Sequence, residues 1–248
     1  MNVLSIDFDY FPDATADVVR NCYPDGHDTS GYKGAFFSSL LWASHYADET
    51  QGERLYDIGI MTDDLNRLKD ILKGQESDTP ALIAFSHLSI YDFIISNIRD
   101  TSEKINIVNI DTHPDMFNDN DIVDCGNWLG HLNREYKCHI EWIANDLSCE
   151  MFGLDDDFKS KVFKKDLYDI LNEERKFDLI FLCRSDLWLP PHLDYDFKEL
   201  AKFIDKRFDT RCEKGIMDVR DYEPLVEAER KTRDEMIKFL TSPQSEER

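Results

Sequence analysis

Short runs of apolar residues recur along the chain, each bounded by polar or turn-forming residues. Runs of this length, with no alternation between apolar and polar positions, are typical of strands that are covered on both faces of a sheet. The first and third of these runs end directly in an acidic residue, Asp7 and Asp111. The pattern predicts strands at residues 3–8, 81–85, 105–110, 138–143 and 178–183.

Between these strands, apolar positions recur with the spacing of amphipathic helices. Strands that alternate with helices favour a mostly parallel sheet covered on both faces, so we expect a three-layer α/β/α fold. Segment 10–34 contains glycines and prolines and predicts a long loop over the edge where such sheets bind ligands. No linker is visible, so we interpret residues 1–248 as one domain with a disordered tail at 241–248. The predicted helices cover residues 34–47, 62–73, 88–98, 157–172, 196–207 and 222–240.

The acidic residues that follow the first and third predicted strands have the spacing of metal ligands. In an extended chain, residues two positions apart point to the same side, so Asp7 and Asp9 would face one cavity. The same spacing would direct Asp111, His113 and Asp115 towards it. Carboxylates buried together would repel one another, and hard divalent ions held by oxygen and imidazole would relieve that cost. The sequence therefore predicts a metal site at this edge of the sheet.

A histidine follows the second predicted strand. Residues 81–90 read ALIAFSHLSI, so this strand runs directly into His87 at the start of a predicted helix. Neutral imidazole is a common metal ligand, although a histidine at such a place can also cap the helix or pack in the core. Because the same sheet edge carries the acidic residues, His87 is a further candidate ligand.

The composition narrows the range of partners. With 248 residues, of which 42% are hydrophobic and 12% aromatic, the chain can bury a sizeable core. A formal charge of −22 argues against nucleic acids and anionic membranes as partners and suits a cationic substrate. The six cysteines form no CxxC pair and no apolar run approaches transmembrane length, so we expect a cytoplasmic protein with free thiols.

Together these motifs resemble those of the ureohydrolase superfamily, which includes arginases, agmatinases and deacetylases. Arginases carry a strand-exit histidine, then Asp-Ala-His-x-Asp, then Ser-x-Asp-x-Asp, which together bind two manganese ions. The matching elements here are His87, DTHPD at 111–115 and SIDFD at 5–9. The Ser-x-Asp-x-Asp element comes first in this chain and last in arginases. A circularly permuted chain order would explain this difference.

Within the superfamily, the chain is most similar to peptide arginases, which convert arginine to ornithine in ribosomally made precursor peptides. The similarity spans most of residues 1–195. It lies in the stretches NIDTHPDM at 109–116, GNW at 126–128 and LCRSDLWLPP at 182–191. The resemblance implies an arginine-containing precursor peptide as substrate and partner, with urea as the second product.

The resemblance also implies which residues hold two Mn²⁺ ions. The ligands would be acidic and histidine side chains at the strand exits, namely Asp7, Asp9, His87, Asp111, His113 and Asp115. His87 and Asp115 would belong to one ion, and Asp9 and His113 to the other. Asp7 and Asp111 would bridge both ions. A water acidified by the two ions would attack the guanidinium carbon, and urea would be released.

Proton delivery to the leaving amine needs a further residue. Arginases use a histidine in Gly-Asn-x-His-Gly, and this chain has Leu129 at that place with His131 two residues later. His131 is our candidate for the catalytic proton shuttle, and a core or surface histidine is the alternative interpretation. His27 and His192 are weaker candidates.

The resemblance assigns Asn127 and Asp186 to substrate binding. A guanidinium group pairs well with a carboxylate, and Asp186 follows the last predicted strand at the same sheet edge. Asp186 would instead be structural if it paired with Arg184. Trp128 and Trp188 are candidates for packing against the aliphatic part of the arginine side chain, or are core residues.

Other functions stay open at this point. An apolar strand ending in Asp-x-Asp also opens the haloacid-dehalogenase phosphatases, but Phe11 stands where they carry Thr or Val, and His87 would have no role. A zinc amidohydrolase like the deacetylases would bind one zinc, whereas Asp9 and Asp115 favour two hard ions. Hydrolysis of free arginine or agmatine and a non-catalytic peptide-binding module are the remaining alternatives.

Overall fold

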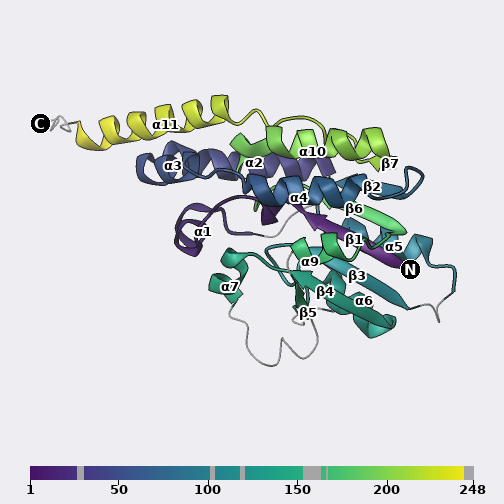
Figure 1. The fold of residues 1–248 in the computed structure, drawn as a ribbon. Helices are drawn as coiled ribbons and strands as arrows, with labels where there is room; N and C mark the ends of the chain where they lie inside the picture. The colour runs from purple at the N-terminus through teal and green to yellow at the C-terminus, as the bar shows by residue number, and fades with distance from the viewer. Residues whose placement is uncertain (27–30, 101–103, 118–120, 153–162, 166, 243–248) are drawn as a thin grey trace, which may run out of the picture.

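The computed structural model describes residues 1–26, 31–100, 104–117, 121–152, 163–165 and 167–242. Within them, a seven-stranded sheet has the order β5-β4-β3-β1-β6-β2-β7, and all pairings between neighbouring strands are parallel. Helices cover both faces (Figure 1), which confirms the predicted three-layer α/β/α class. The strands are β1 (Asn2–Asp7), β2 (Pro80–Ala84), β3 (Ile105–Ile110), β4 (Cys138–Ile143), β5 (Phe163–Lys165), β6 (Leu179–Cys183) and β7 (Asp209–Cys212).

Two hydrophobic cores separate the layers. One lies between the sheet and the larger group of helices, α1 (Ala16–Cys22), α2 (Gly31–Ala47), α3 (Glu49–Tyr56), α4 (Thr62–Lys73), α9 (Leu167–Asn172), α10 (Asp194–Arg207) and α11 (Glu223–Thr241). The other lies beneath α5 (Ser89–Asn97) and α6 (Trp128–Glu135). The described residues also form α7 (Asp146–Phe152) and the 3-10 helices η1 (Phe8–Tyr10) and η2 (Pro191–Leu193). In Figure 1, α11 (yellow) runs along α2 on the outside of the larger layer.

Alternation along the central strand decides which layer the polar side chains face. Val3 on β1 packs in the core beneath α5 and α6, whereas Leu4 and Ile6 pack in the opposite core. Because neighbouring side chains on a strand point to opposite faces, Asp7 points to the α5/α6 side. Cys183, at the end of β6, packs on that same side.

The strand exits that carry the candidate ligands are adjacent in space. β1 pairs with β3 on one side, with Ile6 opposite Ile110, and with β6 on the other, with Asp7 opposite Cys183. β6 in turn pairs with β2, which leads to His87. This arrangement confirms the expectation that the first strand lies beside the strand a hundred residues downstream. In parallel sheets, ligands bind beyond these carboxyl ends.

Two predictions about the elements near the sheet edge are wrong. Segment 10–34 is not one loop, because α1 begins after Thr15, whose Oγ1 accepts a hydrogen bond from the backbone N–H of Val18 at 3.4 Å. Of the helix expected at 157–172, the described residues Leu167–Asn172 are helical, whereas Phe163–Lys165 pair with β4 as a strand. Residues 153–162 and 166 lie outside the described residues.

The remaining sequence-based expectations have mixed outcomes. The tail expected at 241–248 lies outside the described residues from 243 onward, and α11 continues to Thr241. All six cysteines are free thiols, as expected. No helix among the described residues is long and apolar enough to cross a membrane.

Candidate metal centre

Asp7 and Asp9 lie at the exit of β1, and both are buried. Oδ1 of Asp7 accepts a hydrogen bond from the backbone N–H of Asp9 at 3.1 Å, which closes the first turn of η1. Oδ1 of Asp9 accepts a hydrogen bond from the backbone N–H of Thr112 at 3.3 Å, so Asp9 faces the exit of β3. We predicted an extended chain here. Instead, the 3-10 helix η1 directs the Asp9 side chain towards the exit of β3.

Asp111, His113 and Asp115 lie in a loop that follows β3, not in a continued strand. Oδ1 of Asp111 accepts a hydrogen bond from the backbone N–H of His113 at 2.6 Å, which turns the chain back towards β1. The backbone of Asp115 has φ 50°, a left-handed conformation that residues with a Cβ rarely adopt. Its backbone oxygen accepts hydrogen bonds from the N–H groups of Leu129 and Gly130, both at 3.2 Å. The first turn of α6 thus holds Asp115 in this strained conformation.

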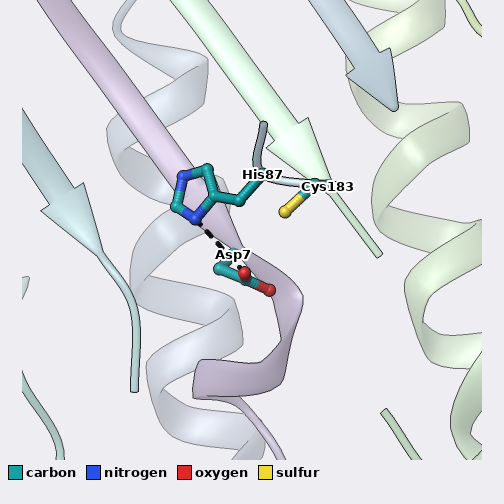
Figure 2. Close-up of side chains that lie close together, drawn as sticks. All are labelled: Asp7, His87 and Cys183. Atoms are coloured by element: carbon teal, nitrogen blue, oxygen red, sulfur yellow. Dashed lines mark ion pairs between the residues drawn. The ribbon is translucent and has the colours of Figure 1, made fainter. Parts of the chain in front are cut away.

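His87 brings the two acidic exits together. Its Nδ1 lies 2.8 Å from Oδ2 of Asp115, 3.1 Å from Oδ2 of Asp111 and 3.3 Å from Oδ2 of Asp7. On the other side of the ring, Nε2 lies 2.6 Å from the hydroxyl oxygen of Ser5. Because Ser5 contacts Nε2 on one side of the ring, Nδ1 on the other side faces the carboxylates, of which Figure 2 shows Asp7.

A second group forms around His113. Its Nδ1 lies 2.8 Å from Oδ2 of Asp9 and 3.6 Å from Oδ1 of Asp111. Asp111 therefore contributes one oxygen to the His87 group and the other to the His113 group. Two aromatic rings flank His113, with centroid distances of 4.3 Å to Trp188 and 5.4 Å to Phe152.

The polar atoms of these groups fit divalent cations. Within the described residues, Oδ2 of Asp9, Nδ1 of His87 and Nε2 of His113 are buried and make no hydrogen bond of normal geometry, although Nδ1 of His87 lies 2.8 Å from Oδ2 of Asp115 and Oδ2 of Asp9 lies 2.8 Å from Nδ1 of His113. Buried polar atoms without partners are costly, and coordination to a metal ion removes that cost. The ligand atoms of Asp9, Asp111 and His113 all lie within 4.8 Å of one another, as do those of His87, Asp111 and Asp115. Carboxylate and imidazole ligands suit hard or borderline divalent ions.

Burial and mutual repulsion shift the pKa values of the acids in different directions. Burial, followed by the charges of Asp7 and Asp111, raises the pKa of Asp9 well above its ordinary value. Burial and the charge of Asp111 raise the pKa of Asp115 to about 8. Burial opposes ionisation of Asp111 as well, but hydrogen bonds and charge from the two histidines outweigh it and hold the pKa of Asp111 below its ordinary range. Opposed shifts among neighbouring carboxyls mark a candidate functional site.

The two imidazoles respond to the same carboxylates. Burial lowers the pKa of each ring, but Asp115 beside His87 and Asp9 beside His113 outweigh this effect. The pKa of both histidines therefore lies well above the ordinary 6.5. The cluster thus requires positive charge near its acids, which protonated imidazoles or divalent ions supply.

Several residues that support the ligands escaped the sequence analysis. Nε1 of Trp128 donates to Oδ2 of Asp115 at 2.5 Å, and Ser185 Oγ donates to Oδ2 of Asp7 at 2.5 Å. Nδ2 of Asn109 donates to Oδ2 of Asp111 at 3.2 Å. Trp128 is fully buried, which supports its interpretation as a core residue over a role in packing against a substrate. For Ser5 and Asn109 the sequence did contain an indication of this supporting role, because each is a polar residue in an apolar strand, two positions before an acidic residue.

The residues predicted for substrate binding make structural contacts. Nδ2 of Asn127 donates to the backbone oxygen of Ile122 at 3.0 Å, and its Oδ1 accepts from the N–H of Asp124 at 2.8 Å. Oδ1 of Asp186 lies 2.5 Å from Nε of Arg184, and its Oδ2 accepts from Nη2 at 3.2 Å. This bidentate pair supports the structural alternative for Asp186 over the substrate role.

The histidines predicted as proton shuttles lie in different places. His131 is a buried residue of α6, and its role in proton transfer stays a prediction. His192 has Nδ1 2.5 Å from the Tyr46 hydroxyl and Nε2 2.9 Å from the backbone oxygen of Ile58, so neighbouring groups hold both of its nitrogens. His27 lies outside the described residues.

Cys183 is a further residue that the sequence analysis did not assign to the site. Its Sγ lies within 4.8 Å of ligand atoms of Asp7 and His87, and all three side chains are buried. Figure 2 shows the sulfur on the same side of β6 as these two residues. The cysteine was hard to recognise because it ends an apolar strand and stands apart from every metal-binding motif.

No family model, curated protein or solved structure matches this chain. Its function is therefore argued from the fold class and from the geometry of the metal centre.

Proposed function

We propose that the chain is a metal-dependent hydrolase of the arginase type, which converts arginine side chains of a peptide to ornithine and releases urea. The observation that carries this proposal is the convergence of buried carboxylates from β1 and β3 on His87 and His113. So many acids buried together are stable only with compensating positive charge. The spacing of acidic and histidine residues in SIDFD and DTHPD resembles that of arginases, and from this resemblance we infer the hydrolysis of arginine side chains.

Manganese is the metal of this proposal, at about two ions per chain, as in two-metal hydrolases. Two trios support the assignment, one of His87, Asp111 and Asp115, the other of Asp9, Asp111 and His113. Asp111 belongs to both trios, which supports its role as a bridging ligand. Asp7 groups with His87 and Cys183, so its expected bridging role stays a prediction.

Bound divalent cations supply Lewis acidity and a nucleophilic water near neutral pH for attack on the guanidinium carbon. In this proposal the reaction would take place beside His113, whose ring contacts the rings of Trp188 and Phe152. Aromatic faces attract a planar guanidinium cation, so Trp188 and Phe152 are suited to orient the arginine side chain. His131 on α6 is the candidate to protonate the departing ornithine amine.

A peptide is the preferred substrate in this proposal. The formal charge of −22 attracts cationic segments and raises the rate at which they encounter the protein. Free arginine carries a carboxylate and gains less from such a field than an arginine within a peptide does. We therefore expect activity on arginine-containing peptides and little on free arginine.

The test loads chelator-treated protein with Mn²⁺ and offers an arginine-containing peptide, free arginine, agmatine and an acetyl-lysine peptide. Urea release and the arginine-to-ornithine mass change are measured together, so that each urea is matched to a modified residue. We expect both signals from the arginine peptide. The Asp111→Ala protein is the control that should lack them.

The alternatives give distinct results in the same assay. Strong urea release from free arginine with none from peptides would refute the peptide preference. Deacetylation of the acetyl-lysine peptide by protein with about one zinc per chain would replace the proposal with a zinc amidohydrolase. If the metal-loaded protein is inactive on every substrate, the non-catalytic peptide-binding module is the alternative that the results support.

A further inference from the structure

Cys183 places a sulfur donor at one end of the metal centre. β1 and β6 pair in register with Asp7 opposite Cys183, so the two side chains leave the sheet on the same face. The thiol is fully buried, and its Sγ lies within 4.8 Å of ligand atoms of Asp7 and His87 (Figure 2). The backbone pairing of two central strands fixes this arrangement.

The surroundings of the thiol are polar on the side of the cluster. Sγ lies 3.5 Å from Oγ of Ser185, and that hydroxyl donates to Oδ2 of Asp7 at 2.5 Å. Ser185 has φ 51°, which shows that the chain turns sharply just after β6 to bring this hydroxyl back to Asp7. A cysteine that only filled space in the core would not need these contacts.

His87 supplies an independent indication that a ligand belongs here. Its side chain is 2% exposed, and Nδ1 makes no hydrogen bond of normal geometry within the described residues although three carboxylate oxygens lie within 3.3 Å of it. This nitrogen is directed at Asp7 while Ser5 holds the far side of the ring. An imidazole nitrogen, a carboxylate oxygen and a thiol sulfur therefore meet at one buried point.

We propose that the metal position beside His87 is a mixed site of oxygen, nitrogen and sulfur, with Cys183 as a ligand. Sulfur ligands select borderline-soft ions, so this position should prefer Zn²⁺ over Mn²⁺. The position formed by Asp9, Asp111 and His113 keeps only oxygen and nitrogen ligands and suits Mn²⁺. The proposed function treats the two positions as alike, whereas this inference makes them chemically different. It rests on the metal centre of the proposed function but not on the arginase reaction.

Metal binding at Cys183 is a simple exchange. The S–H bond breaks, a metal–sulfur bond forms, and one proton leaves to solvent. No electron is transferred, and the sulfur stays in its thiolate oxidation state.

The test uses Co²⁺ as a spectroscopic probe of the intact chain. Chelator-treated protein is titrated with Co²⁺, and the absorption spectrum is recorded. A cobalt–thiolate bond gives an intense near-ultraviolet charge-transfer band, whereas oxygen and nitrogen ligands give only weak visible bands. We expect the charge-transfer band in the unchanged protein and in Cys138→Ala, and its loss in Cys183→Ala. Cys138 is a matched control because it packs on the same core at the opposite end of the sheet.

Metal competition measures the selectivity itself. Protein loaded with Zn²⁺ is dialysed against excess Mn²⁺, and the retained zinc is measured. Loss of Cys183 should weaken zinc retention by more than about 100-fold, beyond the range found when a metal site loses a group that only orients a ligand. Cys183→Ser keeps the size of the side chain, so it separates loss of the sulfur from loss of packing, and circular dichroism checks that each variant is folded.

Every outcome decides the inference. A charge-transfer band that persists in both Cys183 variants, or is absent from the unchanged protein, overturns it, as does a chain that binds no cobalt. If the band appears but no urea is released, Cys183 is a ligand and the proposed reaction is wrong. If urea is released without the band, the reaction stands and the sulfur ligand does not.

Discussion

At the scale of single residues, the metal centre depends on side chains held in conformations that the isolated chain would not favour. Asp115 has a positive φ, and Nε1 of Trp128 holds the carboxylate oxygen that lies 2.8 Å from His87. Such strain is retained where the surrounding packing and hydrogen bonds fix it, as the first turn of α6 does here. Trp128 and the first turn of α6 therefore hold Asp115 in position.

Asp111 is the residue on which both ligand groups depend. Its carboxylate is fully buried, contacts both histidines, and keeps a pKa below the ordinary range. Asp111→Asn keeps the shape but removes the charge, so both groups lose a ligand oxygen of full charge. We expect Mn²⁺ affinity to fall by more than about 100-fold, beyond the loss seen when a residue that only orients a ligand is removed. Calorimetric titration and metal analysis after dialysis measure this.

A substitution at the neighbouring Asn109 is a suitable control for the Asp111 variant. Nδ2 of Asn109 donates one hydrogen bond to Oδ2 of Asp111 at 3.2 Å. Asn109→Ala should weaken Mn²⁺ binding by only about 10-fold, at the low end for a supporting residue. Full Mn²⁺ binding by Asp111→Asn would contradict the assignment of Asp111 as the shared ligand.

At this scale the sequence predicted the acidic and histidine side chains that the fold brings together, but not the residues that support them. Asp7, Asp9, His87, Asp111 and His113 were recognised because acidic and histidine residues follow apolar strands at regular spacing. Trp128 and Cys183 lie far from these motifs along the chain and reach the site only through the tertiary fold. Side-chain contacts of that kind leave no local pattern.

At the scale of elements, burial decided which strands could be predicted. β1, β3 and β6 are covered on both faces, so β6 is an unbroken apolar run and the apolar runs of β1 and β3 are interrupted only by Ser5, Asn106 and Asn109. β7 is an edge strand of sequence DTRC with mostly exposed residues, so no apolar run marks it. β5 has only three residues and lies within the segment 157–172, for which the spacing of apolar residues predicted a helix. Short and exposed elements are held by pairing partners rather than by their own pattern.

A buried ion pair ties several elements together behind the metal centre. Arg220 lies between β7 and α11, and Asp194 begins α10; both are buried. Nε of Arg220 lies 2.9 Å from Oδ2 of Asp194, and its Nη1 and Nη2 donate to the backbone oxygens of Asp186 and Leu189 at 2.6 Å and 2.7 Å. These bonds hold the chain that follows β6.

Arg220→Met should destabilise the fold because it leaves the buried Asp194 carboxylate with only Arg184 as a cation, whose Nη1 lies 3.8 Å from Oδ2 of Asp194. We expect the free energy of unfolding to fall by about 3–5 kcal/mol, the loss typical of breaking a buried pair. Urea denaturation in the presence of a chelator measures this without a contribution from metal. Lys202→Met on the same helix removes an exposed pair with Glu199 and should leave stability unchanged. Equal effects of the two substitutions would show that burial of the pair is unimportant.

At the scale of the whole molecule, the order of the strands creates the site. β3, β1, β6 and β2 are neighbours, so the exits carrying Asp111, Asp7, Cys183 and His87 meet at the middle of one sheet edge. Apolar runs predict strands but not their order in space. The pairing of β1 with β3 was expected only because their acids were assigned to shared ions, and nothing in the sequence placed β6 beside β1.

Metal binding should stabilise the whole molecule, and more strongly as the pH rises. Divalent ions need deprotonated ligands. Burial and the charge of Asp111 raise the pKa of Asp115 to about 8, and burial raises that of Asp9 well above its ordinary value. Protons therefore compete with Mn²⁺ for these oxygens below about pH 8, and the affinity for Mn²⁺ should increase through that range.

The chelator-treated protein should show the opposite trend. A pKa raised by folding means that the folded chain binds more protons than the unfolded chain. The stability from Asp115 is therefore complete below the ordinary 3.8 and is lost as the pH rises through about 8. The raised pKa values of His87 and His113 act with the same sign. Between about pH 6 and about pH 9, Tm with chelator should fall while the increase in Tm from excess Mn²⁺ grows. Thermal melts at constant ionic strength measure both, and an Mn²⁺ increment that does not change with pH would contradict the buried acids as its ligands.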